Sequence, residues 1–532
     1  MPFNNMVHSQ QVPQALISRS VFDRSFNHRT TLDSGYLVPI FDDEVLPGDT
    51  ISLRVTLFAR LATQIVPLLE NAYIEFHLWN VPFRLTWDNF PKFMGEQLNP
   101  GDSIDYLEPI VTAPEGGVAS QSLLNYLGMP QGVSNVWIDA KYPRACNLIY
   151  NEWYRDENLQ DSLPVPKDDG PDDPSIYNLF RRGKRGDYFT NCLPSPQKGP
   201  AATLPLGTEA KVLARKLPIE DGGVQTFAAP YAGSNSGEFY GVLRTFVSSS
   251  NHAVVALGTP VPDSELPIDT GLVTDLTTAL SPTINTIRNA IALQQFLEKD
   301  ARGGTRYIEL IFSHFGVVSP DARLQRPEFL GSFTASLNQN TVAQTSQTTQ
   351  GVSGSPQANL SAYSVFSVLG DTITHSFTEH GVLIGFAHIR ADLSYQYGIE
   401  RAKRRRTRYD YFWPTLSHLG MMEVKNVEIY AQGTDEDDGI FGYTDIYDDY
   451  RTKFNRISGK LNSRDPQSLD YWHLAQKYDS LPKLNSDFIE DKPPFERVIA
   501  VQDEPQFILD ADFEYYHTRP IPQYGTPGLT RI

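Results

Sequence analysis

The segment QFILDADFEYY, residues 506–516, alternates apolar and acidic side chains with a period of two. The apolar set is Phe507, Leu509, Ala511, Phe513 and Tyr515, and the acidic set is Asp510, Asp512 and Glu514. Successive side chains of a strand point to opposite faces, so the pattern predicts a strand with one face in a core and one in water. A sheet with one wet face is typical of antiparallel rather than doubly wound parallel architecture.

Two other segments show the same alternation. In ISLRVTLF, residues 51–58, the shared apolar face is Ile51, Leu53, Val55 and Leu57. In FAHIRADLS, residues 386–394, the apolar set Ala387, Ile389, Ala391 and Leu393 opposes His388, Arg390, Asp392 and Ser394. We therefore expect a mainly β protein with antiparallel sheets, each apolar on one face and wet on the other.

Helical patterns are few. In SPTINTIRNAIALQQFLEKD, residues 281–300, Ser281 is a plausible cap, Pro282 suits the first turn, and apolar residues follow at helical spacing. Residues 143–160, PRACNLIYNEWYRDENLQ, are a second candidate. We expect both helices to pack beside sheets.

Composition limits the class of protein. The 532 residues carry 45 Lys and Arg against 63 Asp and Glu, a formal charge of -18, which argues against wholesale wrapping of nucleic acid. The two cysteines, Cys146 and Cys192, are too few for a disulfide framework and suit a reducing compartment. We expect no secretory signal at the N-terminus and no membrane span, because no apolar run reaches about 18 residues.

The organisation is interpreted as one domain, residues 1–532, with long insertions. Residues 200–275, rich in Gly, Pro, Ser and Ala, are predicted to be a variable insertion, and the almost uncharged residues 334–362 an extended polar loop. Strand-like segments lie on both sides of each. The C-terminal residues 517–532 are either a frayed tail or an arm that docks on its own or a neighbouring subunit.

Enzyme motifs are missing. There is no phosphate-binding Gly-Lys loop, no dinucleotide glycine pattern, no paired-His zinc helix and no nucleophile elbow, so we expect no catalytic site, metal site or cofactor. The 11 histidines are scattered. The acidic residues between 435 and 449 could hold calcium, but they fit an EF-hand poorly and are better interpreted as a solvated loop.

The segment RAKRRRTRYDYFWP, residues 401–414, contrasts with this acidic background. Six of its first eight residues are basic, and without them the formal charge would be -18 - 6 = -24. The residues alone leave three interpretations open: a solvated face, pairing with acidic loops of a neighbouring subunit such as 435–438, or nucleic-acid binding. A weaker second patch is RRGKRG, residues 181–186.

Long stretches of the chain resemble the major capsid protein of the Microviridae, small single-stranded DNA phages, in particular the gokushovirus branch. The matching segments are SRSVFDRSFNHRTTLDSGYLVPIFDDEVLPGDT, WDNFPKFMGEQ, CNLIYNEWYRDENLQ, DYFTNCLPSPQKG, DARGGTRYIELIFSHFGVVSPDARLQRPEFLG, SLDYWHLAQKYDSLPKLNSDFIE and PPFERVIAVQDEPQFILD. They follow one order almost from end to end. This chain departs from the family mainly within 200–275 and 334–362.

The resemblance implies an antiparallel, eight-stranded viral jelly-roll barrel with large loop and short-helix insertions. It implies a non-enzymatic subunit of a small icosahedral (T=1) shell, about sixty copies, around a circular single-stranded DNA genome. The insertion 200–275 would project around the threefold axes and serve host attachment. Implied partners are further copies of the chain, the genome, a small basic internal DNA-binding protein and a bacterial surface receptor, with assembly in the host cytoplasm and the virion as location.

For the basic run, the resemblance favours the nucleic-acid interpretation, because a single-stranded genome lies just inside such a shell. The predicted phosphate contacts are Lys403, Arg404, Arg405, Arg406 and Arg408, and the predicted stacking residues are Tyr409, Tyr411 and Trp413. The alternative from another class is a β-sandwich phage protein that binds or cleaves glycans, of the depolymerase kind. That protein would need a concave site with converging carboxylates and aromatics.

Overall fold

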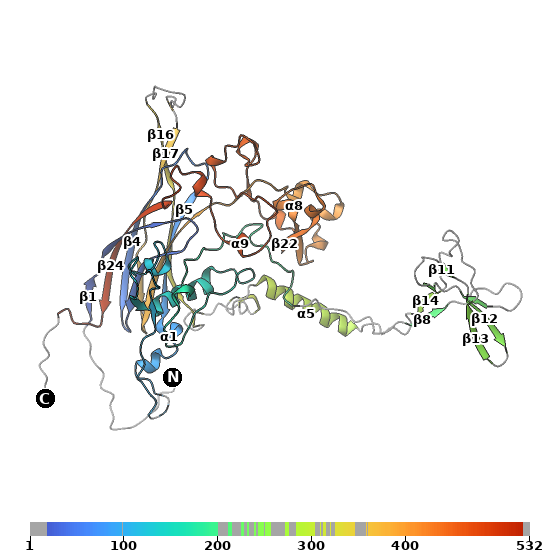
Figure 1. Cartoon of the computed structure of the whole chain (residues 1–532), viewed down its shortest axis with the longest axis horizontal. Coiled ribbons are helices and arrows are strands. Elements are labelled where there is room, and N and C mark those ends of the chain that lie inside the picture. Colours follow the sequence, from blue (N-terminus) through green and yellow to red (C-terminus); the bar gives the residue numbers. More distant parts are fainter. Residues whose placement is uncertain are drawn as a thin grey trace. The chain divides into compact units, whose positions relative to one another are not determined.

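The computed structural model describes residues 19–199 except 98 and 100, then 284–303, 325–345 and 360–524, with short strands between 211 and 275 and a few isolated positions. The chain forms two compact units, residues 1–196 with 299–532, and residues 197–298. The larger unit holds two antiparallel sheets that face each other (Figure 1).

The first sheet has the order β1-β24-β4-β17-β16, with β2 also beside β24 and β18 also beside β4. Its strands are β1 (Ser20–Asp23), β2 (Phe26–Leu32), β4 (Thr50–Leu61), β16 (Asn338–Ala343), β17 (Leu360–Leu369), β18 (Ile373–Ser376) and β24 (Phe507–Arg519). The second sheet has the order β15-β5-β19-β3. Its strands are β3 (Val38–Val45), β5 (Ala72–Pro82), β15 (Glu328–Ser336) and β19 (Gly381–Ala391).

This arrangement confirms the mainly β, antiparallel jelly-roll class. Among the described residues the two sheets contain eleven strands rather than the expected eight, seven in the first and four in the second. The short strands β1, β16 and β18 account for the difference. They lengthen the first sheet along β24, β17 and β4 without changing its antiparallel pairing.

The barrel core lies between the sheets and is built from the alternating segments. Phe507, Leu509, Ala511 and Phe513 of β24 are fully buried, as are Ile51, Leu53 and Leu57 of β4. The two strands pair from Phe507 opposite Leu61 to Thr518 opposite Thr50. The predicted core faces of both segments are therefore confirmed.

The prediction that each sheet has a wet face is wrong for the second sheet. Every residue of β19 is buried, including His388 and Arg390, which were expected to face water. The reason is the long connection between β5 and β15, which packs onto the outer face of this sheet. Trp79 and Phe386 of the sheet contact a second core formed with Trp87, Cys146 and other residues of that connection.

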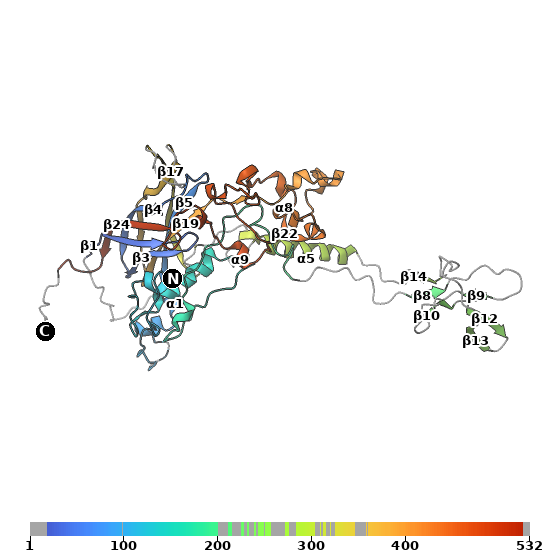
Figure 2. The same cartoon turned by 45° about the horizontal axis from the view of Figure 1, so that its top comes forward.

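The covering connection is made of short elements (Figure 2). They are α1 (Phe83–Thr86), α2 (Phe90–Phe93), β6 (Ile110–Thr112), α3 (Leu123–Tyr126), β7 (Trp137–Asp139) and α4 (Lys141–Ile149). The predicted helix 143–160 is realised as α4, which continues as a π-helical turn at Tyr150–Tyr154 and ends at Arg155, where the backbone is extended.

The second predicted helix is α5 (Ile284–Arg302), and its predicted cap at 281–282 lies outside the described residues. Much of the predicted insertion 200–275 also lies outside them. Its described strands are β8 (Lys211–Ala214), β9 (Gln225–Phe227), β10 (Tyr231–Ala232), β11 (Phe239–Tyr240), β12 (Leu243–Ser248), β13 (Asn251–Ala256) and β14 (Leu272–Asp275). No helix in the described ranges is long and apolar enough to cross a membrane.

The polar segment 334–362 supplies the end of β15, all of β16 and the start of β17, while residues 346–357 lie outside the described part. Asn338 pairs with Val365 and Ala343 with Leu360, so β16 and β17 form a hairpin that extends the first sheet. The predicted C-terminal arm begins inside β24, which ends at Arg519.

Candidate nucleic-acid interface

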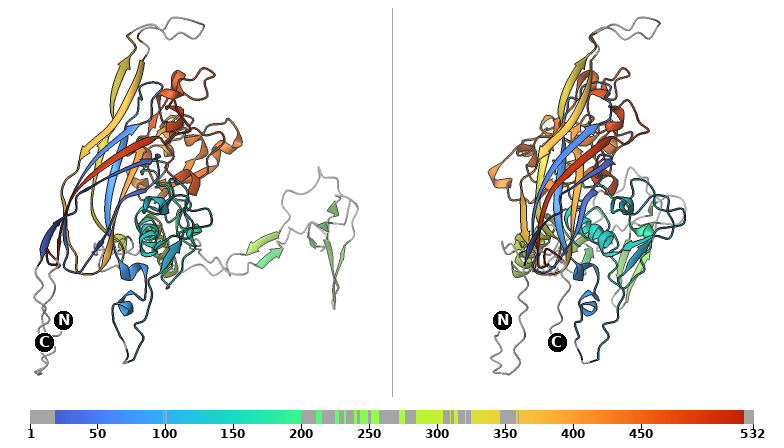
Figure 3. Two further views of the ribbon diagram at one scale, coloured as in Figure 1. Left: turned by 60° about the vertical axis from the view of Figure 1, so that its left-hand side comes forward. Right: turned by 90° about the vertical axis from the view of Figure 1, so that its left-hand side faces the viewer.

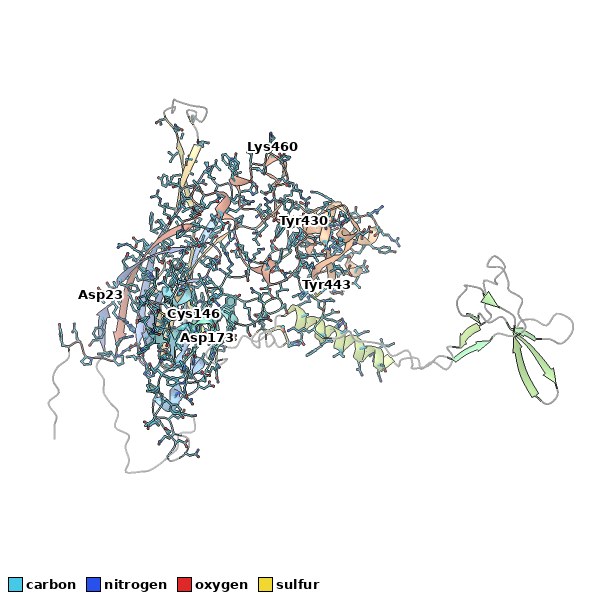
Figure 4. The ribbon with its side chains drawn as sticks, viewed as in Figure 1. Asp23, Cys146, Asp173, Tyr430, Tyr443 and Lys460 are labelled. Carbon is cyan, nitrogen blue, oxygen red and sulfur yellow. The ribbon has the colours of Figure 1, made fainter. Side chains whose placement is uncertain are left out.

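The basic run lies in the connection between β19 and β24, which folds into a cluster of short elements. They are β20 (Ser394–Tyr395), β21 (Met421–Lys425), α8 (Asn426–Ile429), β22 (Ile440–Asp445), β23 (Asn455–Arg456) and α9 (Ser486–Ile489). Tyr430 and Tyr443 mark this cluster in Figure 4. A small core joins this cluster to the connection between β5 and β15; it is formed by Tyr395, Val424, Ile429, Phe441 and Phe488 together with Tyr188, Phe189 and Cys192.

One carboxylate bends the run. Asp410 accepts hydrogen bonds from the backbone N–H groups of Thr407 (2.7 Å) and Arg406 (2.9 Å). These bonds lower the pKa of Asp410, that from Thr407 contributing most, so the carboxylate stays ionised at neutral pH. The Asp410 carboxylate thus binds backbone N–H groups and does not pair with the guanidinium group of Arg406 or Arg408. Both arginines lie at the surface.

Two cations of the run are committed to internal pairs. Arg401 Nη1 lies 3.1 Å from Glu428 Oε1, and the Glu428 side chain is only 3% exposed. Arg405 forms an ion pair with Asp449, and both side chains are 10% exposed. The Arg405 guanidinium also lies 4.1 Å from the centroid of the Tyr450 ring. The predicted phosphate contact at Arg405 thus occupies a structural position.

The other four cations are exposed. Lys403 Nζ lies 3.2 Å from Glu400, and Arg404 Nη2 lies 3.8 Å from Asp438, which is itself 69% exposed. Surface pairs of this kind contribute little, typically about 0–1 kcal/mol, and are easily exchanged for another anion. Arg406 and Arg408 form no ion pair with any residue that the structure describes.

The predicted stacking residues are all at the surface. Tyr409 is 62% exposed, Tyr411 51% and Trp413 47%. Trp413 Nε1 donates to the Arg408 carbonyl at 2.7 Å, which fixes the ring beside the exposed arginine. Phe412, which lies within the same run but was not among the predicted stacking residues, is 50% exposed and packs edge-on against Tyr447.

A cavity of about 390 Å³ opens beside the run. It is lined by Arg401, Arg404, Arg405, Arg406, Thr407, Asp410, Lys425, Val427, Glu428 and Asp438. Lys425 Nζ lies 3.2 Å from Asp438, so Lys425 and Arg404 share one exposed carboxylate. Sequence reasoning missed Lys425, because its place beside the run arises only from the tertiary fold and has no local signal.

The weaker patch at 181–186 is mostly structural. The Arg181 guanidinium lies 3.9 Å from the centroid of the Tyr36 ring, and Arg182 pairs with Glu75. Lys184 donates to the Phe488 carbonyl, and burial lowers its pKa to about 8. Of its four basic residues only Arg185 is exposed, so this segment mainly fastens the cluster of short elements to the barrel.

Most of the acidic residues between 435 and 449 have protein partners. Asp437 accepts from the backbone N–H groups of Gln432 (2.9 Å) and Gly433 (2.8 Å), which closes a turn. Asp445 pairs with Arg302 at 2.5 Å, and Asp449 with Arg405. No group of three or more His, Cys, Asp or Glu with metal-binding geometry occurs among the described residues.

Jelly-roll barrels are typical of viral capsid subunits and lectins. The chain belongs to the phage capsid protein (F protein) family, whose model matches residues 10–529. The predicted relationship to the Microviridae capsid proteins is thereby confirmed.

Three relatives match the sequence over nearly the whole chain. Capsid protein VP1 of Bdellovibrio phage phiMH2K is 44% identical over 529 residues, covering 97% of both chains. VP1 of Chlamydia phage 1 is 40% identical and covers 98% of this chain and 97% of its own. VP1 of Spiroplasma virus 4 is 35% identical and covers 95% of this chain and 94% of its own. All three are named capsid proteins.

Proposed function

We propose that this capsid protein assembles into a T=1 icosahedral shell of about sixty copies around a circular single-stranded DNA genome. The subunit acts structurally and not as an enzyme. Support comes from membership of the phage capsid family and from a jelly-roll barrel with long connections. Such connections usually carry the contacts to partners.

The genome contact is assigned to the exposed part of the basic run. The single observation that carries it is the exposure of Arg406 and Arg408, two cations without a described ion pair, of which Arg408 lies 4.8 Å from the centroid of the exposed Tyr409 ring. Phosphates attract guanidinium groups, and unpaired bases stack on exposed rings. The proposed contact residues are Lys403, Arg404, Arg406 and Arg408 for phosphate, and Tyr409, Tyr411 and Trp413 for bases.

Arg405 has a different role in this proposal. Its pair with Asp449 and its contact with Tyr450 hold the run in place, and Tyr411 also lies 5.4 Å from its guanidinium. Releasing Arg405 to a phosphate would leave Asp449 as an almost buried charge without a partner, which is costly. The acidic remainder of the protein, net charge -18, restricts DNA to the local patch.

The remaining assignments follow the family. We assign host attachment through a bacterial surface receptor to the insertion 200–275, and internal contact to a small basic DNA-binding protein of the phage. Assembly takes place in the bacterial cytoplasm, and the mature location is the virion. Residues 517–519 of the predicted arm belong to β24, and the remaining C-terminal residues 520–532 act as an arm on neighbouring subunits.

A second role for the run has support in one observation. The exposed carboxylate of Asp438 already pairs with Arg404 and Lys425 of the same chain. Since the acidic loop 435–438 can bind these cations within one chain, the same loop of a neighbour could also bind them. The run would then join subunits, and its loss would prevent assembly rather than DNA retention.

Electron microscopy of the expressed protein, alone and with circular single-stranded DNA, tests the proposal. We expect closed particles of one size, and DNA inside them that resists nuclease. Particles that form normally but leave added DNA fully sensitive to nuclease would contradict the genome role. An unassembled protein that cleaves or binds polysaccharide would instead support the glycan alternative.

A further inference from the structure

No element of the described part of the chain packs on the outer face of the first sheet. Figure 3, right, looks toward this side, and no described helix crosses the strands there. Along β17, Tyr363, Ser367 and Leu369 are exposed while Ala362, Ser364 and Phe366 are buried. The second sheet differs, because its outer face is covered by the connection between β5 and β15.

The large apolar or aromatic side chains exposed on this face include Phe58 (47%), Tyr363 (47%), Leu369 (56%) and Ile508 (63%). These four are called the Phe58 patch below. Phe58 of β4 pairs with Ser367 of β17 and with Asp510 of β24. Leu369 and Ile508 are therefore its diagonal neighbours on the same face, about 7–8 Å away and within reach of long side chains.

The size of the Phe58 patch suits the centre of a protein interface. With roughly half of each large side chain exposed, it offers about 400 Å² of mostly apolar surface. The largest apolar patch on a soluble monomer is typically about 300–600 Å² and is often functional. A stable interface buries about 800 Å² per partner, so the patch would fill about half of one, with polar residues at its rim.

The charges around the patch identify the occupant as protein rather than nucleic acid. The same face carries Arg29, Arg54 and Arg60 together with Asp23, Asp510, Asp512 and Glu514. Arg29 lies 3.5 Å from Asp510, and Arg54 lies 3.7 Å from Glu514. Four anions outnumber three cations, so the face has no net attraction for phosphate. The acids of β24 lie between arginines of β2 and β4. When two copies of this face meet, the acids of one can therefore lie opposite the arginines of the other.

We propose that the Phe58 patch is a contact surface for a second copy of this chain, in which the acids of β24 in one copy face the arginines of β2 or β4 in the other. The inference rests on the proposed shell, since a closed shell requires every subunit to bury surface against its neighbours. It goes further by assigning that contact to the outer face of the first sheet.

A single introduced thiol tests the assignment. Cys146 and Cys192 are both buried and unpaired, so an Ile508→Cys substitution supplies one reactive surface thiol. The matched control is Leu107→Cys, because Leu107 is 85% exposed and lies outside both sheets. The rate of maleimide labelling is compared between assembled particles and dissociated subunits of each variant.

We expect position 508 to react at least tenfold more slowly in particles than in subunits. Equal rates at position 508 in particles and subunits would overturn the assignment. The paired variant Phe58→Ser/Ile508→Lys should keep the circular dichroism spectrum and melting temperature of the subunit but raise the concentration needed for assembly at least tenfold. Normal assembly of that variant would also overturn it.

The same thiol separates this inference from the genome role. In shells assembled without DNA, position 508 should still be protected, because the proposed contact is between subunits. Particles that retain no DNA but protect position 508 would reject the genome role alone. Particles that retain DNA but leave position 508 reactive would reject the interface alone.

Discussion

Arg405 and Asp449 form an ion pair in which each side chain is only 10% exposed, inside a run whose neighbouring cations are at the surface. The six basic residues of this segment therefore fall into two groups, those paired with a nearly buried acid and those that are exposed. Arg405, together with Arg401, positions the segment. The exposed cations remain available to a ligand.

The division predicts different effects on stability. Arg405→Ala leaves the Asp449 carboxylate nearly buried and unpaired, so the free energy of unfolding of the subunit should fall by about 3 kcal/mol. Arg406→Ala is the matched control, because Arg406 is exposed, and its effect should stay within about 0.5 kcal/mol. Urea unfolding of dissociated subunits measures both. Equal losses would mean that the pair does not organise the run.

A second prediction concerns acid. Burial alone would raise the pKa of Glu75, but Arg182 and Arg390 outweigh it and lower the pKa to about 2. The Arg390 Nε atom lies 2.5 Å from Glu75 Oε1. Because the folded-state pKa is below the unfolded value of 4.5, the resulting stability is present above pH 4.5 and lost as pH falls toward 2.

Glu75→Gln should therefore destabilise the subunit by about 3 kcal/mol at pH 7 and flatten the pH dependence of its stability between pH 4.5 and 2. The control is Glu379→Gln, whose partner Arg84 is 31% exposed, with an expected effect below about 1 kcal/mol. Urea midpoints across this pH range provide the comparison. A Glu75→Gln variant with the original acid dependence would contradict the assignment.

The C-terminal arm gives a third prediction. Deletion of residues 520–532 leaves β24 intact, since the strand ends at Arg519, so the barrel should fold with an unchanged circular dichroism spectrum. Tyr524 is 74% exposed within the chain, which leaves its ring free to anchor on a neighbour. Sedimentation should show folded subunits that no longer form intact particles. Normal shells from the truncated chain would reject the arm.

Limited proteolysis tests the insertion. Its Gly- and Ser-rich composition, as in YAGSNSGEFYG at 231–241, predicts a segment that is dispensable for barrel folding and accessible outside the shell. Protease added to assembled particles should cut first within 200–275. First cleavage within 401–414 would place the basic run outside and the insertion inside, contrary to the proposal.

Strands with one wet face could be read from the sequence, whereas strands buried on both faces could not. In β24 the alternation gave the correct core face from Phe507 to Tyr515, because its other face meets water. In β19 the polar residues His388 and Arg390 suggested a wet face. They are buried because a distant segment covers them and Glu75 and Asp491 lie beside them. Such coverage depends on tertiary packing.

The sequence was enough to predict which segment forms the candidate site. It was not enough to predict which of the basic residues hold the segment in place and which are exposed to a ligand. The run 401–414 is conspicuous in an acidic chain, and the rings that follow its cations are exposed. That Arg405 is internal and Arg406 is exposed depends on Asp449, which is 44 residues away in the sequence. Lys425 joins the same cavity by the fold alone.

The salt dependence of binding to single-stranded DNA tests the central claim most directly. If Lys403, Arg404, Arg406 and Arg408 each neutralise one phosphate, log affinity should fall with log salt at a slope near -3, from about 0.7 per phosphate. Arg406→Ala/Arg408→Ala should flatten that slope by about 1.4 and reduce the DNA retained in particles.

The control pair, Lys460→Ala/Lys477→Ala, removes two exposed charges outside the run and should leave the slope unchanged. All proteins are measured by fluorescence anisotropy with one labelled oligonucleotide from low to high salt. The account predicts the flatter slope for the arginine pair only. An unchanged slope in that variant, together with failed assembly, would contradict it and show that the run joins subunits instead of holding the genome.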